Sequence, residues 1–445
     1  MPYKSKAITL RVGKALPGSM FKILKLAGDI ADKKKLKAFI VGGFVRDVLL
    51  GVKNFDVDIV LEGKGLLFAK TLAKELSGSL VVYERFGTAT VVTGLKLKAK
   101  KGSLKDKEKK IKIDIATARK EYYEYPAALP RVSFSSIRQD LYRRDFTINA
   151  MAVSLHKKTF GSLIDFFNGQ RDLKAKRIRV LHDMSFVEDP TRIFRAIRFE
   201  QRYNFTIEPH TEELIKTAMN LNMFGKTQKQ RLRNEIVLIL SEESPVKALM
   251  RMHQLHELRF IHPRLKLTKG MIRLFHSIDE TCSWYKLSMP KKIAIDSWII
   301  YFMAMLDDIR LPQVKNICEK FIFTKGDEKR LISCKRYAEK VIKALKQRNS
   351  LRPSQIYKLL EPLAYEVILF IMAKSKSQIA KERILLFFKR YNGVRVSIGG
   401  KDLKRLGVVP GPRYKRILNR VLYDKLDGKI AGKKKELELA ERLNR

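Results

Sequence analysis

The stretch FIVGGFVRDVLLGVKNFDVDIV, residues 39–60, decides the fold of the N-terminal part of this chain. A short apolar run leads into Gly42 and Gly43, a short helical pattern follows, and a β-type run then carries Asp56 and Asp58. Residues two apart in a strand project to the same face, so the two carboxylates are predicted to stand side by side. The stretch therefore predicts a strand, a glycine turn, a helix and a second strand.

The same residues have a chemical interpretation. Glycines allow the backbone to approach a phosphate closely, and the N–H groups at the start of a helix point at that anion. Paired carboxylates supply the oxygen ligands that divalent metal ions require. Each piece has a common alternative, because a glycine pair is often only a turn and an Asp-x-Asp pair is often a solvated strand edge. In this order they predict a nucleotidyltransferase, with two Mg²⁺ ions at Asp56 and Asp58 and a triphosphate at Gly42, Gly43 and Arg46. Arg46 and Asp47 are also suited to a purely structural ion pair.

The chain resembles the class II tRNA nucleotidyltransferases and bacterial poly(A) polymerases of the polymerase β superfamily, which carry a GG–VRD–DxD module. The resemblance continues through RRDFTINAMAV (143–153), IDFFNGQRDL (164–173) and EDPTRIFRAIRF (188–199), with a weaker echo in GGKDLKRLGVVPGP (399–412). It implies the metal-binding role for Asp56 and Asp58, and it gives weaker support to a catalytic role for Asp114. The alternative for Asp114 is a strand-end carboxylate that pairs with a nearby lysine.

The motif at 143–153 begins with Arg143, Arg144 and Asp145, ahead of a helix-like apolar run. Taken alone, Asp145 is a good helix N-cap, and Asn149 is able to hydrogen-bond locally. The resemblance implies instead that the motif lies over the sugar and triphosphate and distinguishes ribose from deoxyribose. A carboxylate that accepts from a 2′-hydroxyl beside a guanidinium suits that task.

The EDPTR motif also has two interpretations. Asp189 followed by Pro190 is an ordinary helix start, but this does not account for Arg192. Residues three apart share a helix face, so a carboxylate acceptor and a guanidinium donor would stand together. That pair matches the base edge of cytosine or adenine, whereas guanine and uracil present the opposite pattern. The resemblance implies that the enzymes select C and A in this way.

Further arginines follow on the same chain segment. Arg195 and Arg198 complete the predicted nucleotide-binding set. In KTQKQRLRNEI (226–236), Arg231 and Glu235 are predicted to support the base-selecting helix, with an exposed helical ion pair as the alternative.

Composition points to a polyanionic partner. The chain has 445 residues, and 92 Lys+Arg against 46 Asp+Glu give a net charge of +46. Nucleic acid fits this charge better than a membrane, because no apolar stretch is long enough to span a bilayer. General basicity for solubility is the alternative. Three widely spaced cysteines, Cys282, Cys318 and Cys334, indicate reduced thiols in a cytoplasmic protein, and the first residues carry no secretion-signal pattern.

The predicted fold class is an α/β nucleotidyltransferase head with a mixed β-sheet, followed by an all-α neck, body and tail. The expected boundaries are 1–180 for the catalytic head, 181–245 for a neck with the nucleotide-selecting motif, 246–350 for the body and 351–445 for a tRNA-binding tail. The lysine-rich segment 96–112 is predicted to be a mobile hairpin loop, either a solvated surface or a flap that contacts RNA.

The leading functional hypothesis is a template-independent tRNA nucleotidyltransferase that adds C and/or A to the tRNA 3′ end from CTP and/or ATP. The resemblance implies that the distal helices grip the acceptor arm and TΨC region of tRNA. A poly(A) polymerase is the alternative, although ERFGTATV (84–91) replaces the basic GRRF-like segment typical of those relatives. A catalytically dead RNA-binding protein is a third hypothesis. The choice among CCA, CC-only and A-only addition, and the oligomeric state, stay open.

Overall fold

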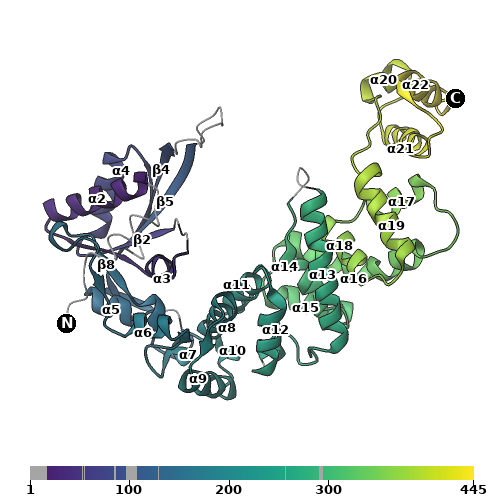
Figure 1. The fold of residues 1–445 in the computed structure, drawn as a ribbon. Coiled ribbons are helices and arrows are strands. Elements are labelled where there is room, and N and C mark those ends of the chain that lie inside the picture. Colours follow the sequence, from purple (N-terminus) through teal and green to yellow (C-terminus); the bar gives the residue numbers. More distant parts are fainter. Residues whose placement is uncertain are drawn as a thin grey trace. The chain divides into compact units, whose positions relative to one another are not determined.

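A computed structural model describes residues 18–52, 54, 56–84, 87–96, 108–128, 130–255, 257–289 and 294–445. The chain separates into two compact units, Met1–Arg231 and Leu232–Arg445. The strands belong to the first unit and the second unit is helical, as Figure 1 shows, so the expected α/β head with an all-α remainder is confirmed. The finer boundaries at 180, 245 and 350 stay predictions. The N-terminal segment 1–17 and most of the lysine-rich loop, residues 97–107, lie outside the described residues.

The head is built on a mixed sheet, as predicted. Within the described residues, this sheet has seven strands in the order β3-β4-β5-β2-β1-β8-β9. β2 and β5 pair in parallel, and the other neighbours pair antiparallel. The strands are β1 (Lys37–Val41), β2 (Val57–Glu62), β3 (Ser79–Tyr83), β4 (Thr88–Lys96), β5 (Glu108–Thr117), β8 (Ala152–Ser154) and β9 (Leu163–Ile164). Two smaller pairs join β6 (Arg119–Tyr122) to β7 (Arg131–Phe134), and β10 (Arg177–Ile178) to β11 (Thr206–Ile207).

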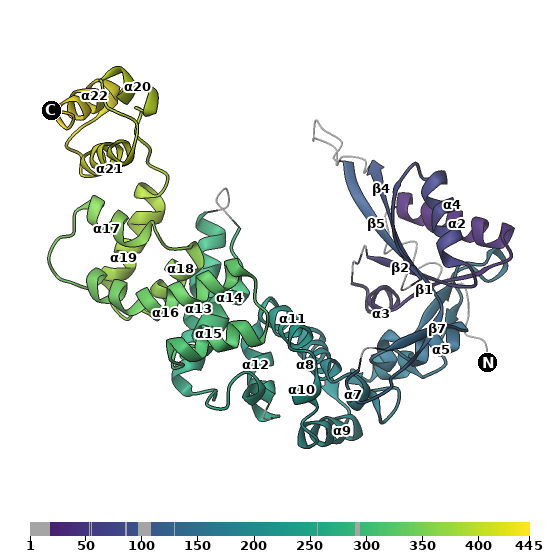
Figure 2. The ribbon, with the colours of Figure 1, turned by 180° about the vertical axis from the view of Figure 1, so that it is seen from behind.

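Helices cover the two faces of the sheet differently. α2 (Gly18–Lys33) packs against β1, and α4 (Gly65–Glu75) packs against β4 and β5, both on the same side of the sheet (Figure 2). On the other face, Phe39 and Val60 form a buried cluster with Ile137 and Leu141 of α5 (Ile137–Tyr142). Alternate strand residues face opposite sides of a sheet, so this second face is the one that Asp58 shares with Val60.

The remaining helices of the first unit lie partly against the sheet and partly beyond it: α3 contacts β1, whereas α8 contacts β10 and β11. α8 begins directly after Pro190 and ends at Tyr203, and its C-cap, Asn204, has a left-handed backbone with φ 52°. Most of α8 is buried, so it serves as the central helix of this region. These elements are α3 (Gly43–Leu50), η2 (Thr147–Asn149), η3 (Lys157–Thr159), α6 (Gly169–Lys174), α7 (Ser185–Glu188), α8 (Thr191–Tyr203), α9 (Pro209–Asn220) and α10 (Met223–Lys226), and α11 (Lys229–Leu240) runs across the boundary between the units.

The second unit has its core around two almost fully buried helices, α14 and α18, which are apolar on all sides. None of the helices described by the structure is long and apolar enough to cross a membrane. The elements are α12 (Pro245–Gln254), η4 (Glu257–Phe260), α13 (Lys269–Ser288), α14 (Ser297–Met305), α15 (Leu311–Lys320), α16 (Lys325–Leu345), α17 (Pro353–Leu360), α18 (Tyr365–Lys374), α19 (Gln378–Leu386), η5 (Phe387–Tyr391), α20 (Gly400–Arg405), α21 (Pro412–Leu426) and α22 (Gly432–Arg442).

Candidate active site

One row of side chains crosses four strands of the head sheet on a single face. Val41, Asp58, Asp114 and Thr90 are register partners across β1, β2, β5 and β4. Directly paired residues project to the same side, so the carboxylates of Asp58 and Asp114 are neighbours. Asp114 is also engaged from its flanks, because Thr90 Oγ1 donates to its Oδ1 at 2.6 Å and Lys112 Nζ donates to its Oδ2 at 2.8 Å. Asp114 therefore forms the lysine pair that was its alternative role in the sequence analysis. It also lies next to Asp58, where the catalytic role is predicted.

Asp56 lies just before β2, whose first residue is Val57. Its backbone N–H donates to Asn54 Oδ1 at 2.9 Å, and Asn54 Nδ2 donates to Asp47 Oδ2 of α3 at 2.8 Å. The sequence placed both aspartates in the strand, but the strand holds only Asp58 of the two. Asp56 is instead positioned through the loop and α3.

A pocket of about 380 Å³ opens over the row. The protein around Asp58 displaces bulk water although solvent still reaches the carboxylate, and this desolvation raises its pKa. The negative charges of Asp114 and Asp56 raise the pKa further, while Arg144 opposes the shift. The clustered carboxylates thus carry an electrostatic cost that a bound cation would relieve. The pocket is lined by Val41, Asp58, Ile59, Val60, Tyr83, Thr88, Ala89, Thr90, Lys112, Asp114, Ile115, Ala116, Arg143 and Arg144.

The glycine turn lies between a guanidinium and a carboxylate. Gly42 has φ 73°, and a Cβ added there would stand 2.8 Å from Arg144 Nη1 and 3.8 Å from Asp58 Oδ2. Only glycine suits both the left-handed backbone and the close approach. Gly43 begins α3, and a Cβ there would stand 3.3 Å from Arg46 Nη2.

Arg46 is held inside the head. It is 5% exposed, its Nε donates to Asp47 Oδ1 at 2.8 Å, and its Nη1 donates to Asn149 Oδ1 at 2.6 Å. Its guanidinium also lies over the rings of Phe199 and Tyr203, at 5.2 and 4.6 Å from their centroids. The structural pair with Asp47 that the sequence allowed is therefore formed, and direct nucleotide contact by Arg46 stays a prediction.

Arg143 and Arg144 share one buried anchor, Asp140. Asp140 Oδ1 accepts from Arg143 Nη2 at 2.8 Å, and Asp140 Oδ2 accepts from Arg144 Nη2 at 2.9 Å. Burial alone would raise the pKa of Asp140, but the two guanidiniums hold it below its usual range. Glu121 of β6 accepts from Arg143 Nη1 at 2.9 Å. Arg144 Nε is buried and has no hydrogen-bond partner among the described residues.

The motif at 145–149 does not begin a helix. Residues after Asp145 form a single 3₁₀ turn, η2, and then strand β8, so the expectation of a helix-like run is wrong. The apolar residues of this run are buried, and Ala152 and Val153 lie in the sheet as part of β8. Asp145 Oδ1 accepts from Asn149 Nδ2 at 2.9 Å, and Asp145 Oδ2 accepts from Arg195 Nη2 at 2.6 Å. Burial opposes ionisation of Asp145, but Arg195 and Asn149 lower its pKa to about 2.

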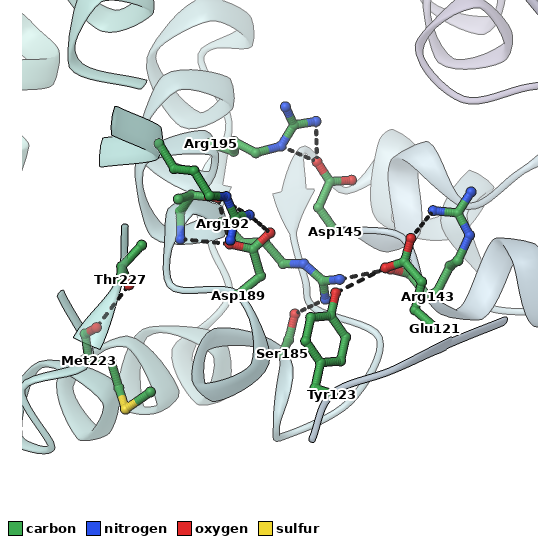
Figure 3. A network of polar contacts seen from close by, with 12 residues as sticks. Glu121, Tyr123, Arg143, Asp145, Ser185, Asp189, Arg192, Arg195, Met223 and Thr227 are labelled. Atoms are coloured by element: carbon green, nitrogen blue, oxygen red, sulfur yellow. Dashed lines mark hydrogen bonds and ion pairs between the residues drawn. The ribbon is translucent and has the colours of Figure 1, made fainter. Parts of the chain in front are cut away.

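Asp189 and Arg192 lie at the start of α8 and have separate partners (Figure 3). Asp189 Oδ1 accepts from the Thr191 backbone N–H at 3.1 Å, as a helix cap does, and its Oδ2 accepts from Arg231 Nη2 at 2.6 Å. Arg192 is 5% exposed, and it donates to Ser185 Oγ at 2.7 Å and to the Arg143 carbonyl at 2.8 Å. Asp189 therefore bonds to the first residue of α8, although Pro190 occupies the N-cap position, and base reading stays a prediction.

The other arginines of the motif differ in accessibility. Arg195 is about one-third exposed and pairs with Asp145, while Arg198 is buried beside the ring of Phe199. Arg231 pairs with Asp189 at 2.6 Å, a contact that suits the supporting role, and the roles of Arg231 and Glu235 stay predictions.

Sequence reasoning missed several residues of the site. Asp140 was detectable, because it lies three and four positions before Arg143 and Arg144, the spacing of helical ion pairs. Glu121, whose Oε2 accepts from the Tyr123 hydroxyl at 2.9 Å, and Ser185 have no such local signal. Their contacts depend on how β6 and α7 meet the head.

The carboxylates of the pocket are suited to Mg²⁺, which prefers oxygen ligands. Among the described residues, no group of three or more His, Cys, Asp or Glu side chains forms a ready-made metal site. Mg²⁺ in nucleotide enzymes is typically held by one or two carboxylates together with water and substrate phosphates. Asp56 and Asp58, with Asp114 alongside, supply such a donor set, and their mutual repulsion at Asp58 fits a cation. These three aspartates are therefore suited to hold Mg²⁺.

Comparisons with known proteins agree with this geometry. A family model described as Poly A polymerase head domain matches residues 38–179, and one described as Probable RNA and SrmB-binding site of polymerase A matches residues 204–268. An A-adding tRNA nucleotidyltransferase of Geobacter sulfurreducens is 40% identical over all of this chain and 49% of its own length. The A-adding enzyme of Halalkalibacterium halodurans is 30% identical over 98% of this chain and 96% of its own. The chain spans about half the length or less of two of the curated relatives that it matches.

Solved structures match along the whole chain. A CCA-adding enzyme in an apo form is 35% identical with a TM-score of 0.76, covering 97% of each chain. The Thermotoga maritima CCA-adding enzyme complexed with tRNA is 34% identical with a TM-score of 0.71, again covering 97% of each chain. CCA-adding enzyme structures with CTP and with ATP, both 33% identical, have TM-scores of 0.74 and 0.72 and cover 97% of this chain, and 97% and 95% of their own chains. These likenesses place the chain in the family of class II tRNA nucleotidyltransferases and poly(A) polymerases, to which it belongs.

Proposed function

We propose that the chain is a template-independent tRNA nucleotidyltransferase that adds A and/or C to the 3′ end of tRNA, using ATP and/or CTP. The observation that carries the proposal is the row formed by Asp58 and Asp114, with Gly42 and Arg144 directly beside it. Carboxylates for cations, a backbone that admits a phosphate and a guanidinium for its charge meet in one pocket. Relatives named A-adding make ATP addition to a tRNA ending in CC the first reaction to assay.

The residues of the pocket have distinct roles in this proposal. Asp56 and Asp58 would hold Mg²⁺, which when bound supplies the positive charge needed at the primer hydroxyl and the leaving pyrophosphate. The Gly42 turn lets a phosphate oxygen come close to the backbone, and Arg144, whose Nη1 lies beside Gly42, supplies positive charge to the same anion. Asp140 keeps Arg144 in place, so this positive charge is oriented before the nucleotide arrives.

Base selection is assigned to Asp189 and Arg192. A carboxylate has about four lone-pair positions, so Asp189 can accept from a base amino group while it keeps Thr191 and Arg231. Arg192 uses two donors on Ser185 and the Arg143 carbonyl, and contact with a base requires a free N–H or the exchange of one of these bonds. The bonds to Ser185 and the Arg143 carbonyl hold the Arg192 guanidinium near the start of α8, where the proposal places the base.

The proposed macromolecular partner is tRNA. The net charge of +46 supports a polyanion, and so does the Thermotoga maritima relative, which was solved with tRNA. A pocket of about 1040 Å³ in the second unit is suited to phosphates, because six cationic side chains line it against two carboxylates. These cations are Lys315, Lys325, Lys329, Arg336, Lys340 and Lys358. A cytoplasmic place of action belongs to the proposal and is supported by the free, buried cysteines.

The experiment uses tRNAs that end in the discriminator base, in C or in CC, each incubated with one nucleotide at a time. Sequencing the products should show addition of A and/or C and no addition of G or U. Extension of tRNA by a long A tract would identify a poly(A) polymerase. No extension of any of the three tRNAs would refute the proposal.

A further inference from the structure

Lys112 brings a positive charge into the carboxylate pocket. It lies on β5 two residues before Asp114, so both side chains share one face of the strand. Its Nζ stands 2.8 Å from Asp114 Oδ2, while Thr90 occupies Asp114 Oδ1. Both oxygens of Asp114 are thus engaged. In this state, a divalent cation at Asp114 would have to share an oxygen with the ammonium.

The same ammonium acts on the other two carboxylates. The hydrogen bond and the charge of Asp114 raise the pKa of Lys112, and the charge of Asp56 adds to that rise. Desolvation raises the pKa of Asp58, while Lys112 together with Arg144 opposes it. One lysine is therefore coupled to Asp58 and Asp114, which line the pocket, and to the nearby Asp56.

The position of this ion pair distinguishes it from an ordinary one. The Lys112 side chain is 62% exposed, and exposed ion pairs contribute little to stability. Lys37, whose side chain is 71% exposed, pairs with the less exposed Glu62 at 3.0 Å on β1 and β2, outside this pocket. A long, flexible lysine at the mouth of a pocket can leave its partner at small cost, which is not so for a buried arginine.

We propose that Lys112 is a resident counter-cation of the carboxylate pocket: it holds Asp114 while the pocket is free of metal, and a divalent cation displaces it. The inference rests on the proposed function, because that function places the metal at these carboxylates. Displacement follows from charge, since an ammonium and a divalent ion repel each other when they share the same oxygens. Lys112 thereby sets how readily the pocket takes up metal.

The first test measures Mn²⁺ binding to the full-length protein, without nucleotide, by electron paramagnetic resonance. Lys112→Met should bind Mn²⁺ roughly two- to fivefold more tightly than wild type, the range expected for loss of an exposed ion pair. Lys112→Arg keeps the charge and should bind close to wild type. Lys37→Met is the matched control and should change nothing, and Asp58→Asn should lose most of the binding.

The second test separates displacement from a simple effect of charge. Lysines are acylated with an N-hydroxysuccinimide ester in the absence and presence of Mg²⁺, and the sites are quantified by mass spectrometry. Mg²⁺ should speed labelling of Lys112, because its ammonium leaves Asp114, and should leave labelling of Lys37 unchanged.

The inference is overturned if Lys112→Met binds Mn²⁺ no more tightly than wild type, or if Mg²⁺ leaves the labelling of Lys112 unchanged or slower. Failure of wild type to bind Mn²⁺ overturns it as well. The proposed function is judged separately, by extension of tRNA by the wild-type protein. A protein that extends tRNA but fails these two tests refutes the role of Lys112 alone.

Discussion

Replacing Asp140 with asparagine should loosen two arginines of the pocket at once. Asp140 is fully buried and accepts from Arg143 at 2.8 and 3.1 Å and from Arg144 at 2.9 Å. The amide keeps one acceptor oxygen, turns an N–H₂ group toward one of the guanidiniums and removes the negative charge between them. Arg144 should then lose the orientation that places it beside Gly42.

The expected loss of folding stability follows from how deeply Asp140 and its two arginines are buried. Breaking a buried ion pair typically costs about 3–5 kcal/mol. Arg143 retains Glu121 at 2.9 Å and the arginines keep 20% and 17% exposure, so a cost of about 2–3 kcal/mol is expected. For a unit of this size, that corresponds to roughly 5–10 °C in melting temperature. Because the folded pKa of Asp140 is lowered, its contribution is present above the unfolded pKa and disappears as pH falls through the folded pKa.

The assay combines thermal unfolding between pH 6 and 8 with the KM for ATP. Asp140→Asn should unfold earlier across this range and raise the KM roughly tenfold, about 1.4 kcal/mol. Asp172→Asn is the matched control: Asp172 is 3% exposed and bonded to Arg179 and Thr147, but it does not line the pocket. The control should unfold earlier with little change in KM. An Asp140 variant with wild-type melting temperature and KM would refute the reasoning.

Three further predictions concern base choice, pH and salt. Asp189→Ala should lose roughly tenfold to a hundredfold discrimination against UTP and GTP in single-turnover incorporation; unchanged discrimination would leave Asp189 as a helix cap alone. His182 has its pKa lowered to about 4 by burial and by Arg192, despite Glu188 at 3.5 Å, so stability should fall by about 2–3 kcal/mol as pH drops from 6.5 to 4. His182→Gln should abolish that loss in urea unfolding, and an equal loss in the variant would contradict it. If the six cations of the second-unit pocket each neutralise a phosphate, log affinity for tRNA should fall with log salt at a slope of about −4 to −5, whereas a flat dependence would contradict this.

Local patterns predicted the elements around the site well. The apolar run before Gly42 is β1, the segment after Gly43 is α3, and the alternation around Asp58 is β2. Each element depends on neighbours in sequence, which periodicity and glycine placement report directly. The prediction of a helix after Asp145 was wrong for a related reason. Its short apolar run is buried in the sheet as β8, and apolar runs of that length do not separate helix from strand.

Local sequence patterns could not predict the contacts between segments that are far apart in the chain. The pairing of Asp58 with Asp114 depends on β2 and β5 lying in parallel, although they are separated by α4 and a hairpin. Arg192 is predicted to face a base beside Asp189, and this stays a prediction; its contacts with Ser185 and the Arg143 carbonyl could not be foreseen from the sequence. Spacing along one helix does not reveal which neighbouring segment supplies the acceptors.

The central claim is that the carboxylate row of β2 and β5 carries the chemistry. It is tested most directly by rapid-quench, single-turnover addition of ATP and CTP to tRNA by wild type and Asp58→Asn, with tRNA affinity measured in parallel. The variant should bind tRNA as wild type does and lose at least about a thousandfold in the rate of addition, because an amide cannot replace the carboxylate as a Mg²⁺ ligand. An Asp58→Asn protein that adds nucleotides at a rate near wild type would contradict the account.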